Sequence, residues 1–456
     1  MAQSPHDHHL ALDPDLYRSP TPSSKRLSAA SRIMRPPSSL SEYNKPKSLD
    51  SVLLNASSAG VSRPSSGVIT PPSSPRMVTS FEVKPHVPDA NHGPTFEIRL
   101  PDLFASIMSV KAHFNPNFKQ VKPEADLYVA RTLRLTPKQA MRNAKADFAF
   151  LVAWWAPNAD AEALRTLIDW QHWAFPWDDM FDEGEFKDDL AGAAADIIDM
   201  TSILDDSYPP IPADTDKPIR YAFQQNWFAI RKRAGPSLQH RYKMYLKHYM
   251  LGVLRQVSSR ARDPRKITVD EYLNFRRGTI GAMPCFCLVE YAEGIDLPQY
   301  VIDHPSIQAC QQVAVDLVLM DNDVLSYRKD LIEGEELNLV NILRFSKGLT
   351  LQEAIDEIDV MLMDRYKTWY RALVELPSWG HKIDGEVLRY LDGCRNVALG
   401  SLIWSFHTGR YFKPHEGELV RREQKLWIAE ELLAGIDGRP KKDEVLNKPE
   451  IGTAYF

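Results

Sequence analysis

Hydrophobic and polar positions follow a helical period through most of the chain. From about residue 95 onward, apolar residues recur at spacings of three and four, whereas the alternation typical of strands is scarce. The pattern predicts helices over residues 137–155, 160–173, 190–205, 219–257, 269–293, 306–330, 351–374 and 386–408. We therefore expect an all-α fold, with a single helical domain over residues 91–433.

The two ends of the chain have a different composition. Residues 1–90 are rich in serine and proline and poor in aromatic side chains, so they bury too little apolar area to offset the entropy of ordering. We expect a disordered tail there, and a polar tail over residues 434–456. Residues 1–30 lack the apolar segment of a secretory signal. The four cysteines lack zinc-ligand spacing and fit a reducing compartment, so we expect a cytoplasmic protein.

The charge balance excludes several classes of partner. The 456 residues carry 55 Lys and Arg against 60 Asp and Glu, a net charge of −5. No strong positive field is available to hold nucleic acid or an anionic membrane. The longest apolar run, about residues 148–157, is far shorter than the roughly 18 residues that suggest a membrane span. We expect no nucleic-acid partner, no stable membrane anchor, and a monomer or homodimer.

The first candidate metal site lies where a predicted helix rich in aromatic residues ends in a group of acidic residues. Residues 170–183 read WQHWAFPWDDMFDE. On a helix, Asp178 and Asp182 share a face one turn apart, where like charges repel. Carboxylates so placed, with Asp179 beside them, make sense if hard cations lie between them, because Mg²⁺ takes oxygen ligands. A solvated acidic helix end is the alternative, but the neighbouring tryptophans and Phe175 favour the mouth of a pocket.

A second polar row lies on a mostly apolar helix. Residues 319–330 read LMDNDVLSYRKD, in which Asn322, Ser326 and Asp330 are spaced by four. They drift only about 80° around the helix, so an amide, a hydroxyl and a carboxylate form one row of oxygen donors suited to Mg²⁺. The alternative is a polar stripe on a surface helix. The apolar run over residues 313–320 indicates burial instead, and unpaired polar groups would be costly there.

Together the two segments resemble the DDxxD and NDxxSxxxE motifs of class I terpene cyclases, in the family's order and about 140 residues apart. The resemblance covers roughly residues 96–430 and is closest to fungal sesquiterpene cyclases, the group that includes presilphiperfolanol synthases. It implies a helical bundle around a central active-site cavity. The chain departs from the family at Asp330, where glutamate is usual. Aspartate is shorter by one methylene, so the last metal ligand has less reach.

Further positions match the family's contacts with the substrate diphosphate. Arg276 lies 46 residues before the motif asparagine, and Lys329 directly precedes the last ligand. Arg410 and Tyr411 match a terminal Arg-Tyr pair. The arginines are planar, bidentate donors of the kind that a diphosphate needs.

The resemblance also implies an aromatic pocket that holds a carbocation away from water. Trp404 lies six residues before the terminal arginine, where the family often has an aromatic side chain, and Phe175 lies beside the first motif. Phe148 and Trp155 are further candidates, with ordinary core packing as the alternative. Residues 278–284 (GTIGAMP) contain two glycines and a proline, which predict a break in the helix.

The implied reaction is magnesium-dependent cyclisation of farnesyl diphosphate. Three Mg²⁺ ions would act as Lewis acids and clamp the leaving diphosphate, and the remaining cation would close to a sesquiterpene hydrocarbon or alcohol. The implied metal ligands are Asp178, Asp179, Asp182, Asn322, Ser326 and Asp330.

Three alternatives stay open. The substrate could be geranyl or geranylgeranyl diphosphate, since chain length depends on pocket volume. A chain-elongating prenyltransferase would carry a second DDxxD motif, which the chain lacks. A helical scaffold without enzymatic activity would leave both motifs as solvated faces. The sequence does not predict the product.

Overall fold

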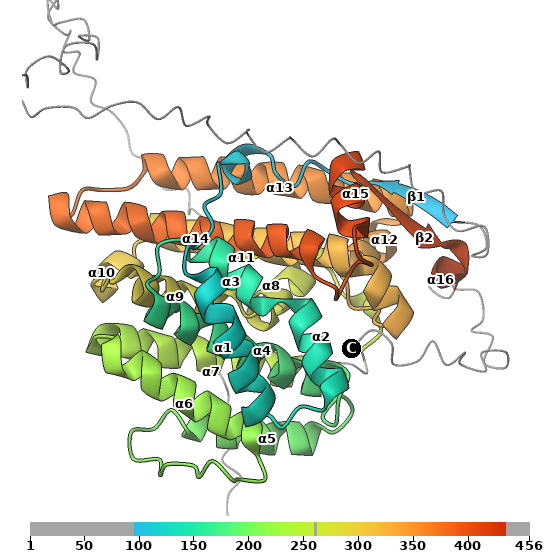
Figure 1. Cartoon of the computed structure of the whole chain (residues 1–456). Helices are drawn as coiled ribbons and strands as arrows, with labels where there is room; N and C mark the ends of the chain where they lie inside the picture. Colours follow the sequence, from blue (N-terminus) through green and yellow to red (C-terminus); the bar gives the residue numbers. More distant parts are fainter. Residues whose placement is uncertain (1–94, 260–261, 435–456) are drawn as a thin grey trace, which may run out of the picture. The chain divides into compact units, whose positions relative to one another are not determined.

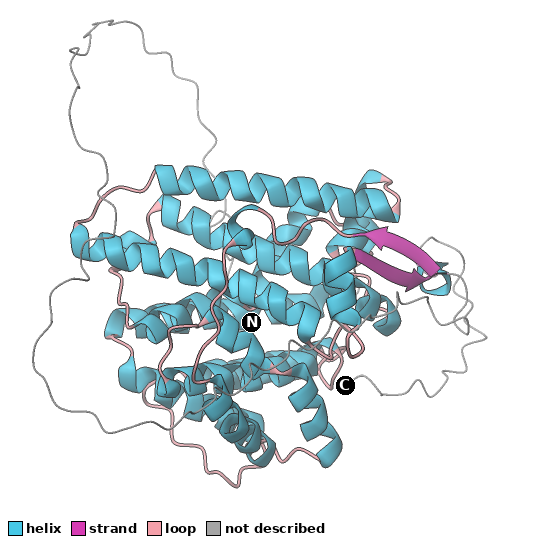
Figure 2. Ribbon diagram, turned by 45° about the horizontal axis from the view of Figure 1, so that its top comes forward, coloured by secondary structure: helices cyan, strands magenta, loops and turns pink. Residues whose placement is uncertain are grey.

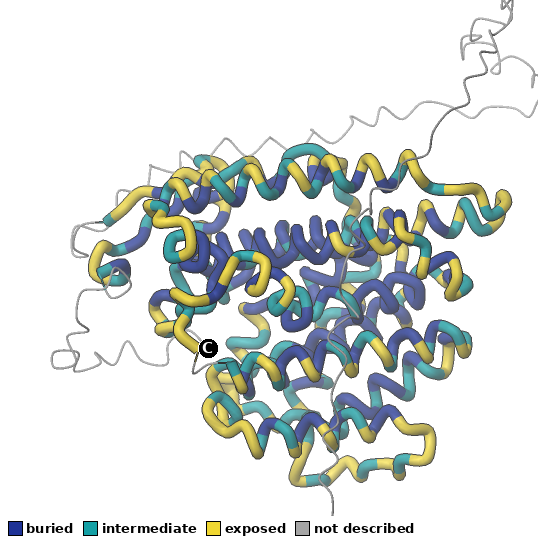
Figure 3. The backbone as a smooth tube through the Cα atoms, turned by 180° about the vertical axis from the view of Figure 1, so that it is seen from behind, coloured by how far each residue is buried: buried dark blue, intermediate teal, exposed yellow. Residues whose placement is uncertain are grey.

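Helices make up nearly all of the regular structure in the computed structural model, which describes residues 95–259 and 262–434 (Figures 1 and 2). Helix α11 (Pro305–Glu333) is buried along most of its length. It packs against α13 (Leu351–Val374) and α14 (His381–His407), and also against α8 (Val269–Thr279) and α9 (Ala282–Glu293). Figure 3 shows the buried positions gathered on the inner helices. The predicted all-α fold is confirmed.

The other helices complete the bundle around α11. The remaining α-helices are α1 (Phe118–Thr132), α2 (Pro137–Ala146), α3 (Phe148–Trp155), α4 (Ala161–Asp182), α5 (Leu190–Ser202), α6 (Pro218–Arg233), α7 (Pro236–Ser259), α10 (Gln299–Ile302), α12 (Leu339–Lys347), α15 (Glu416–Glu423) and α16 (Glu430–Ala434). Within the described ranges, no helix is both long and apolar enough to cross a membrane.

Two ranges in which no break was predicted are each divided into two helices. The range 137–155 breaks at Asp147, which has a left-handed backbone (φ 52°) and caps α3 by accepting the Phe150 N–H at 3.1 Å. The range 219–257 breaks at Ala234, which is extended before Gly235 and Pro236, and Pro236 begins α7. The apolar period continues across both breaks and so conceals them.

Helix α4 extends nine residues beyond the predicted range 160–173 and passes through Pro176. Proline removes one helical hydrogen bond and usually ends a helix. Here Trp173 and Trp177 lie on either side of Pro176 and are fully buried, so their packing offsets the lost bond. The longer helix carries the first acidic motif into the interior.

A small antiparallel sheet joins the two ends of the described chain. Strand β1 (Thr95–Arg99) pairs with β2 (Lys425–Ala429), and Thr95 lies opposite Ala429. Ile98 and Ile428 turn inward and are fully buried. The predicted tails, residues 1–90 and 434–456, lie outside the described residues except for Ala434.

Candidate active site

The two acidic motifs, far apart in the sequence, line one cavity of about 190 Å³. Helix α4 supplies one wall and α11 the other. The cavity also receives side chains from α8, α14 and the segment after α14; its predicted lining residues are Phe175, Asp178, Asp182, Arg276, Asn322, Ser326, Lys329, Asp330, Trp404, Arg410 and Tyr411. The structure thus brings together every predicted metal ligand except Asp179, all four predicted diphosphate contacts, and two of the four candidate aromatic residues.

An apolar chamber of about 100 Å³ adjoins the polar cavity. Phe175, Asp178 and Ser401 line both spaces, so the two spaces share part of their walls. The chamber's walls also include Trp155 and Trp170. The combined space is polar at one end and apolar at the other.

On α4, the two carboxylates that face the cavity each accept a hydrogen bond from α7. The Tyr249 hydroxyl donates to Asp178 at 2.7 Å, and the Gln256 amide donates to Asp182. Burial, and then the charge of Asp182, raise the pKa of Asp178 well above its ordinary value. A cation between these carboxylates would relieve both effects.

Asp179 is the exception among the predicted metal ligands. It points to Arg410, with O–N distances of 3.0 and 3.3 Å, and does not line the cavity. Asp179 is therefore placed to hold this arginine, which itself lines the cavity.

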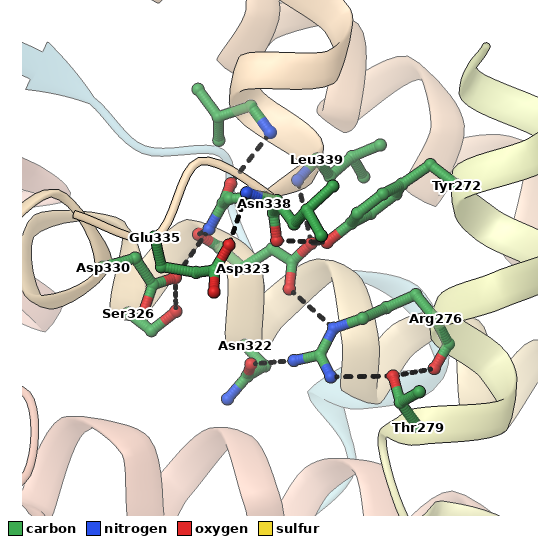
Figure 4. A network of polar contacts seen from close by, with 12 residues as sticks. Tyr272, Arg276, Thr279, Asn322, Asp323, Ser326, Asp330, Glu335, Asn338 and Leu339 are labelled. Carbon is green, nitrogen blue, oxygen red and sulfur yellow. Dashed lines mark hydrogen bonds and ion pairs between the residues drawn. The ribbon is translucent and has the colours of Figure 1, made fainter. Parts of the chain in front are cut away.

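On α11, the three residues of the second motif lie in a row (Figure 4). The Ser326 hydroxyl donates to Asp330 at 2.7 Å, and the amide of Asn338, at the start of α12, donates to the same carboxylate oxygen at 2.9 Å. Burial raises the pKa of Asp330 to about 6. The two donors fix the position of this carboxylate.

Arg276 is held between α8 and α11 by two residues of the second motif (Figure 4). It donates to Asn322 at 2.8 Å and to Asp323 at 3.3 Å. Asp323 also accepts from the Tyr272 hydroxyl and from the backbone N–H of Leu339. The neighbouring Arg277 points elsewhere and pairs with Asp316.

Lys329 and Tyr411, which were also predicted to contact the diphosphate, interact with other side chains of the protein. Lys329 bridges Glu183 at the end of α4 and Glu333 on α11. Burial opposes the charge on Lys329, but the surrounding carboxylates raise its pKa to about 12. The Tyr411 hydroxyl accepts a hydrogen bond from the Asn322 amide at 2.9 Å.

The predicted aromatic residues form a stack along one wall of the cavity. Phe175 and Trp404 line the cavity, with ring centroids 5.5 Å apart. Phe148 stacks on Phe175 at 4.2 Å and supports it rather than lining either space. Trp155 lines the apolar chamber. The Arg410 guanidinium lies 5.3 Å from the centre of the Phe175 ring. The aromatic stack therefore also contacts one of the arginines predicted to bind diphosphate.

The predicted helix break lies between α8 and α9. Gly281 adopts a left-handed backbone (φ 70°), which glycine accepts without strain. Nearby, α7 and α8 approach so closely that a Cβ at Gly252 would lie 2.4 Å from the Gly278 carbonyl oxygen. The break and the close approach place Arg276 and Ile280 at the cavity.

Several residues at or beside the cavity could not be identified from the motifs or from the residues next to them in the sequence. Tyr249 and Gln256 lie 71 and 74 residues along the chain from the carboxylates that they contact. Asn338 lies eight residues after Asp330, in the connection to α12. Lys187, in the segment after α4, also lines the cavity. Only the helical period of α7, which places positions 249 and 256 on one face, could have linked the first two.

The donor set fits a hard divalent cation better than a soft one. Carboxylate, amide and hydroxyl oxygens line both walls, and these suit Mg²⁺. Among the described residues, no three His, Cys, Asp or Glu side chains gather closely enough to hold a metal ion by themselves. Bound cations would therefore need oxygens from Asn322, Ser326, water or a substrate phosphate.

Comparison with known proteins identifies relatives along most of the chain. A family model described as terpene synthase family 2, C-terminal metal binding, matches residues 169–368. Terpene cyclase 4 of Gibberella fujikuroi is 44% identical over 330 residues, which cover 72% of this chain and 89% of the relative. The (+)-eremophilene synthase of the same organism is 41% identical, with 73% and 93% covered.

Solved structures show the same fold at lower identity. An α-eudesmol synthase aligns with a TM-score of 0.59 at 20% identity, covering 65% of this chain and 96% of that one. A germacradien-4-ol synthase from Streptomyces citricolor aligns with a TM-score of 0.58 at 21% identity, covering 67% and 100%.

Proposed function

Since the chain belongs to the class I terpene synthase family, and is therefore a carbon–oxygen lyase, we propose that it is a magnesium-dependent sesquiterpene cyclase acting on farnesyl diphosphate. Its relatives include proteins named as an eremophilene synthase, a silphinene synthase and sesquiterpene synthase 6, all from fungi. One observation carries the proposal. Two rows of oxygen donors, from α4 and α11, line the polar end of a space whose other end is aromatic and apolar.

The metal ligands in this proposal are Asp178 and Asp182 on one wall and Asn322, Ser326 and Asp330 on the other. Three Mg²⁺ ions, when bound, would supply Lewis-acid stabilisation of the departing diphosphate. Among the described residues, the carboxylates are too few to hold these ions by themselves. This agrees with Mg²⁺, which is usually bound by one or two carboxylates and completes its coordination with water and phosphate oxygens.

The cationic side chains would bind the diphosphate. Arg276, Lys329 and Arg410 line the cavity from three elements, and Tyr411 adds a hydroxyl. Each cation is paired with a carboxylate in the structure, so substrate binding would exchange these partners for phosphate oxygens. Donors placed around the leaving group stabilise the charge that develops as the C–O bond breaks.

The aromatic and apolar residues would act on the prenyl chain. Phe175 lines both the polar cavity and the apolar chamber, and Trp404 lines the polar cavity beside it. Their ring faces can therefore stabilise an allylic cation by roughly 0.5–2 kcal/mol each. The chamber excludes water while rings close. No protein nucleophile is needed for ionisation.

The direct test is incubation with geranyl, farnesyl and geranylgeranyl diphosphate, with and without Mg²⁺. We expect farnesyl diphosphate to give C15 hydrocarbons or alcohols by gas chromatography with mass spectrometry, together with Mg²⁺-dependent release of diphosphate. C10 or C20 products would change the proposed substrate. Elongation in the presence of isopentenyl diphosphate would favour a prenyltransferase, and no product from any substrate would contradict the proposal.

Single substitutions test the two walls separately. We expect Asp178→Asn and Asn322→Ala each to lower kcat by about 100-fold or more, because each removes stabilisation of the leaving group. Asp199→Asn and Asn274→Ala are matched controls at exposed positions, where the side chains pair with Arg220 and Arg277. Turnover at the wild-type rate in either cavity variant would remove that residue from the proposed site.

The remaining proposals concern the location, oligomeric state, partners and domain bounds of the protein. We propose a cytoplasmic monomer or homodimer without nucleic-acid partners. We also propose that the catalytic domain spans residues 91–433. The net charge of −5 and the absence of a spanning helix in the described part of the chain are consistent with these proposals.

A further inference from the structure

Helix α7 presents two neutral hydrogen-bond donors to the acidic end of α4. The Tyr249 hydroxyl donates to Oδ1 of Asp178 at 2.7 Å, and the Gln256 amide donates to Oδ1 of Asp182. The donors are seven residues apart and share one face of α7, while the acceptors are one turn apart on α4. The two contacts therefore form a matched pair between the same two helices.

Packing fixes the position of this face of α7. Tyr249 is 5% exposed, and its ring lies against Trp177 at 5.7 Å. Gly252, between the two donors, lies against Gly278 of α8, where even a methyl group would collide with the backbone. Because α7 contacts both α4 and α8 here, the two donors have little freedom to move away from the carboxylates.

A donor that holds one carboxylate oxygen determines where the other oxygen points. On the basis of the proposed function, we propose that Tyr249 and Gln256 are positioning residues, which orient Asp178 and Asp182 for binding a divalent cation. Gln256 also lines the polar cavity and Tyr249 the apolar chamber, but the positioning role does not require either side chain to touch the cation. Both donors are neutral at ordinary pH, so they orient the carboxylates without cancelling the negative charge that attracts the metal.

The same helix offers a matched control. Tyr242 lies seven residues before Tyr249, is fully buried, and uses its hydroxyl to accept a hydrogen bond from Trp170 at 2.9 Å. A Tyr→Phe change at position 242 removes the same atom from the same helix. It leaves the contacts of both carboxylates intact.

The test compares the wild-type full-length chain with Tyr249→Phe, Gln256→Leu and Tyr242→Phe. Binding of Mn²⁺ in the presence of inorganic diphosphate is followed by electron paramagnetic resonance of the free ion. Loss of an outer contact to a metal ligand typically lowers metal affinity 10–100-fold, so we expect the Kd for Mn²⁺ to rise by about that factor in the first two variants. Tyr242→Phe should leave it within about twofold.

Steady-state kinetics give a second readout. In Tyr249→Phe and Gln256→Leu, the Mg²⁺ concentration for half-maximal diphosphate release should rise about as much as the Kd, and saturating Mg²⁺ should restore most of kcat. Equal metal affinity in Tyr249→Phe, Gln256→Leu and wild type would overturn the inference. So would equal losses in Tyr249→Phe and Tyr242→Phe, because these would indicate a packing effect.

The outcomes separate this inference from the proposed function. A wild-type chain that binds Mn²⁺ and releases diphosphate, with variants that do the same, overturns the positioning role alone. A wild-type chain that does neither overturns the proposed function and this inference with it. If Tyr249→Phe fails to give a native circular dichroism spectrum, the half-buried Gln256 decides the question.

Discussion

At the scale of the residue, burial changes the ionisation of His172 in α4. The side chain is 2% exposed, and burial, followed by the charges of Lys122 and Arg165, lowers its pKa to about 3. In the unfolded chain the pKa returns to about 6.5. Below pH 6.5 the unfolded state therefore binds a proton that the folded state does not. The stability that neutral His172 contributes is present above pH 6.5 and is lost as the pH falls toward 3.

We expect His172→Gln to reduce the dependence of stability on pH between 6.5 and about 4.5. The wild type should lose up to about 1.4 kcal/mol more per pH unit than the variant, because one proton is involved. Urea unfolding at pH 7.5, 6.5, 5.5 and 4.5 measures the difference. His415→Gln is the control, since His415 is 85% exposed. Parallel curves for wild type and His172→Gln would contradict the prediction.

The residues that carry oxygen donors were predictable because spacing by four fixes a helix face. Asp178 and Asp182 needed only that rule, and so did Asn322, Ser326 and Asp330 in their row. Their roles in catalysis stay proposals. The partner Tyr249 could not be predicted, because its contact depends on how two distant helices pack. Asn338 lies only eight residues after Asp330, but the path of the connection between α11 and α12 decides whether they meet.

At the scale of the element, the junction between α11 and α12 depends on one fully buried amide. Asn338 caps α12 by accepting the N–H of Val340, and it donates to the Asp330 carboxylate and to the Asp323 carbonyl (Figure 4). The amide group thus joins the end of one helix to the start of the next. It also fixes the last predicted metal ligand.

Asn338→Asp separates these two tasks, because aspartate caps helices as well as asparagine does. It replaces the donor with a second carboxylate beside Asp330. We expect a loss of about 3 kcal/mol of unfolding free energy at pH 8, from repulsion and from the loss of both hydrogen bonds that the amide donates. The loss should be smaller at pH 5, where the two carboxyl groups can share a proton. Urea unfolding at both pH values measures the effect.

A matched control for this change lies on the surface. Asn158 donates to Glu293 at 3.1 Å but is exposed, so Asn158→Asp should cost less than about 1 kcal/mol. Equal losses for Asn338→Asp at pH 8 and pH 5 would show that charge repulsion is not the cause.

The long helices that line the core were predictable, but α1, α12 and the two strands fall outside every predicted range, and several boundaries were missed. Apolar residues at helical spacing indicate that a segment is buried as a helix, and they continue across Asp147 and Ala234, where the backbone turns. At Pro176 the error is the opposite one. The proline suggests that the helix ends, but tertiary packing keeps α4 helical through it. The break at Gly281 was predictable, since two glycines and a proline stand together there.

At the scale of the whole molecule, the helical domain is expected to fold and act without most of the serine- and proline-rich segment. Deletion of residues 1–80 should leave kcat within about twofold and Tm within a few degrees, because this serine- and proline-rich segment has too few apolar side chains to add much to a core. Thermal unfolding and product assays measure both. Loss of turnover in this variant would show that the segment takes part in catalysis.

Deletion of residues 1–99 is the contrasting variant. It also removes β1, so β2 loses its pairing and the buried Ile98 is lost. We expect Tm to fall by several degrees, since a loss of about 2–3 kcal/mol is typical for a large buried aliphatic side chain. An unchanged Tm would show that the sheet does not stabilise the domain.

The pairing of β1 with β2 would also allow the chain to be circularly permuted. Thr95 lies directly opposite Ala429, so a short linker could join the last helix to the first strand. The polypeptide could then be opened in the exposed loop before α6, giving a circular permutant with new termini. Such a permutant would keep every helix contact around the cavity while moving both ends of the chain to another loop.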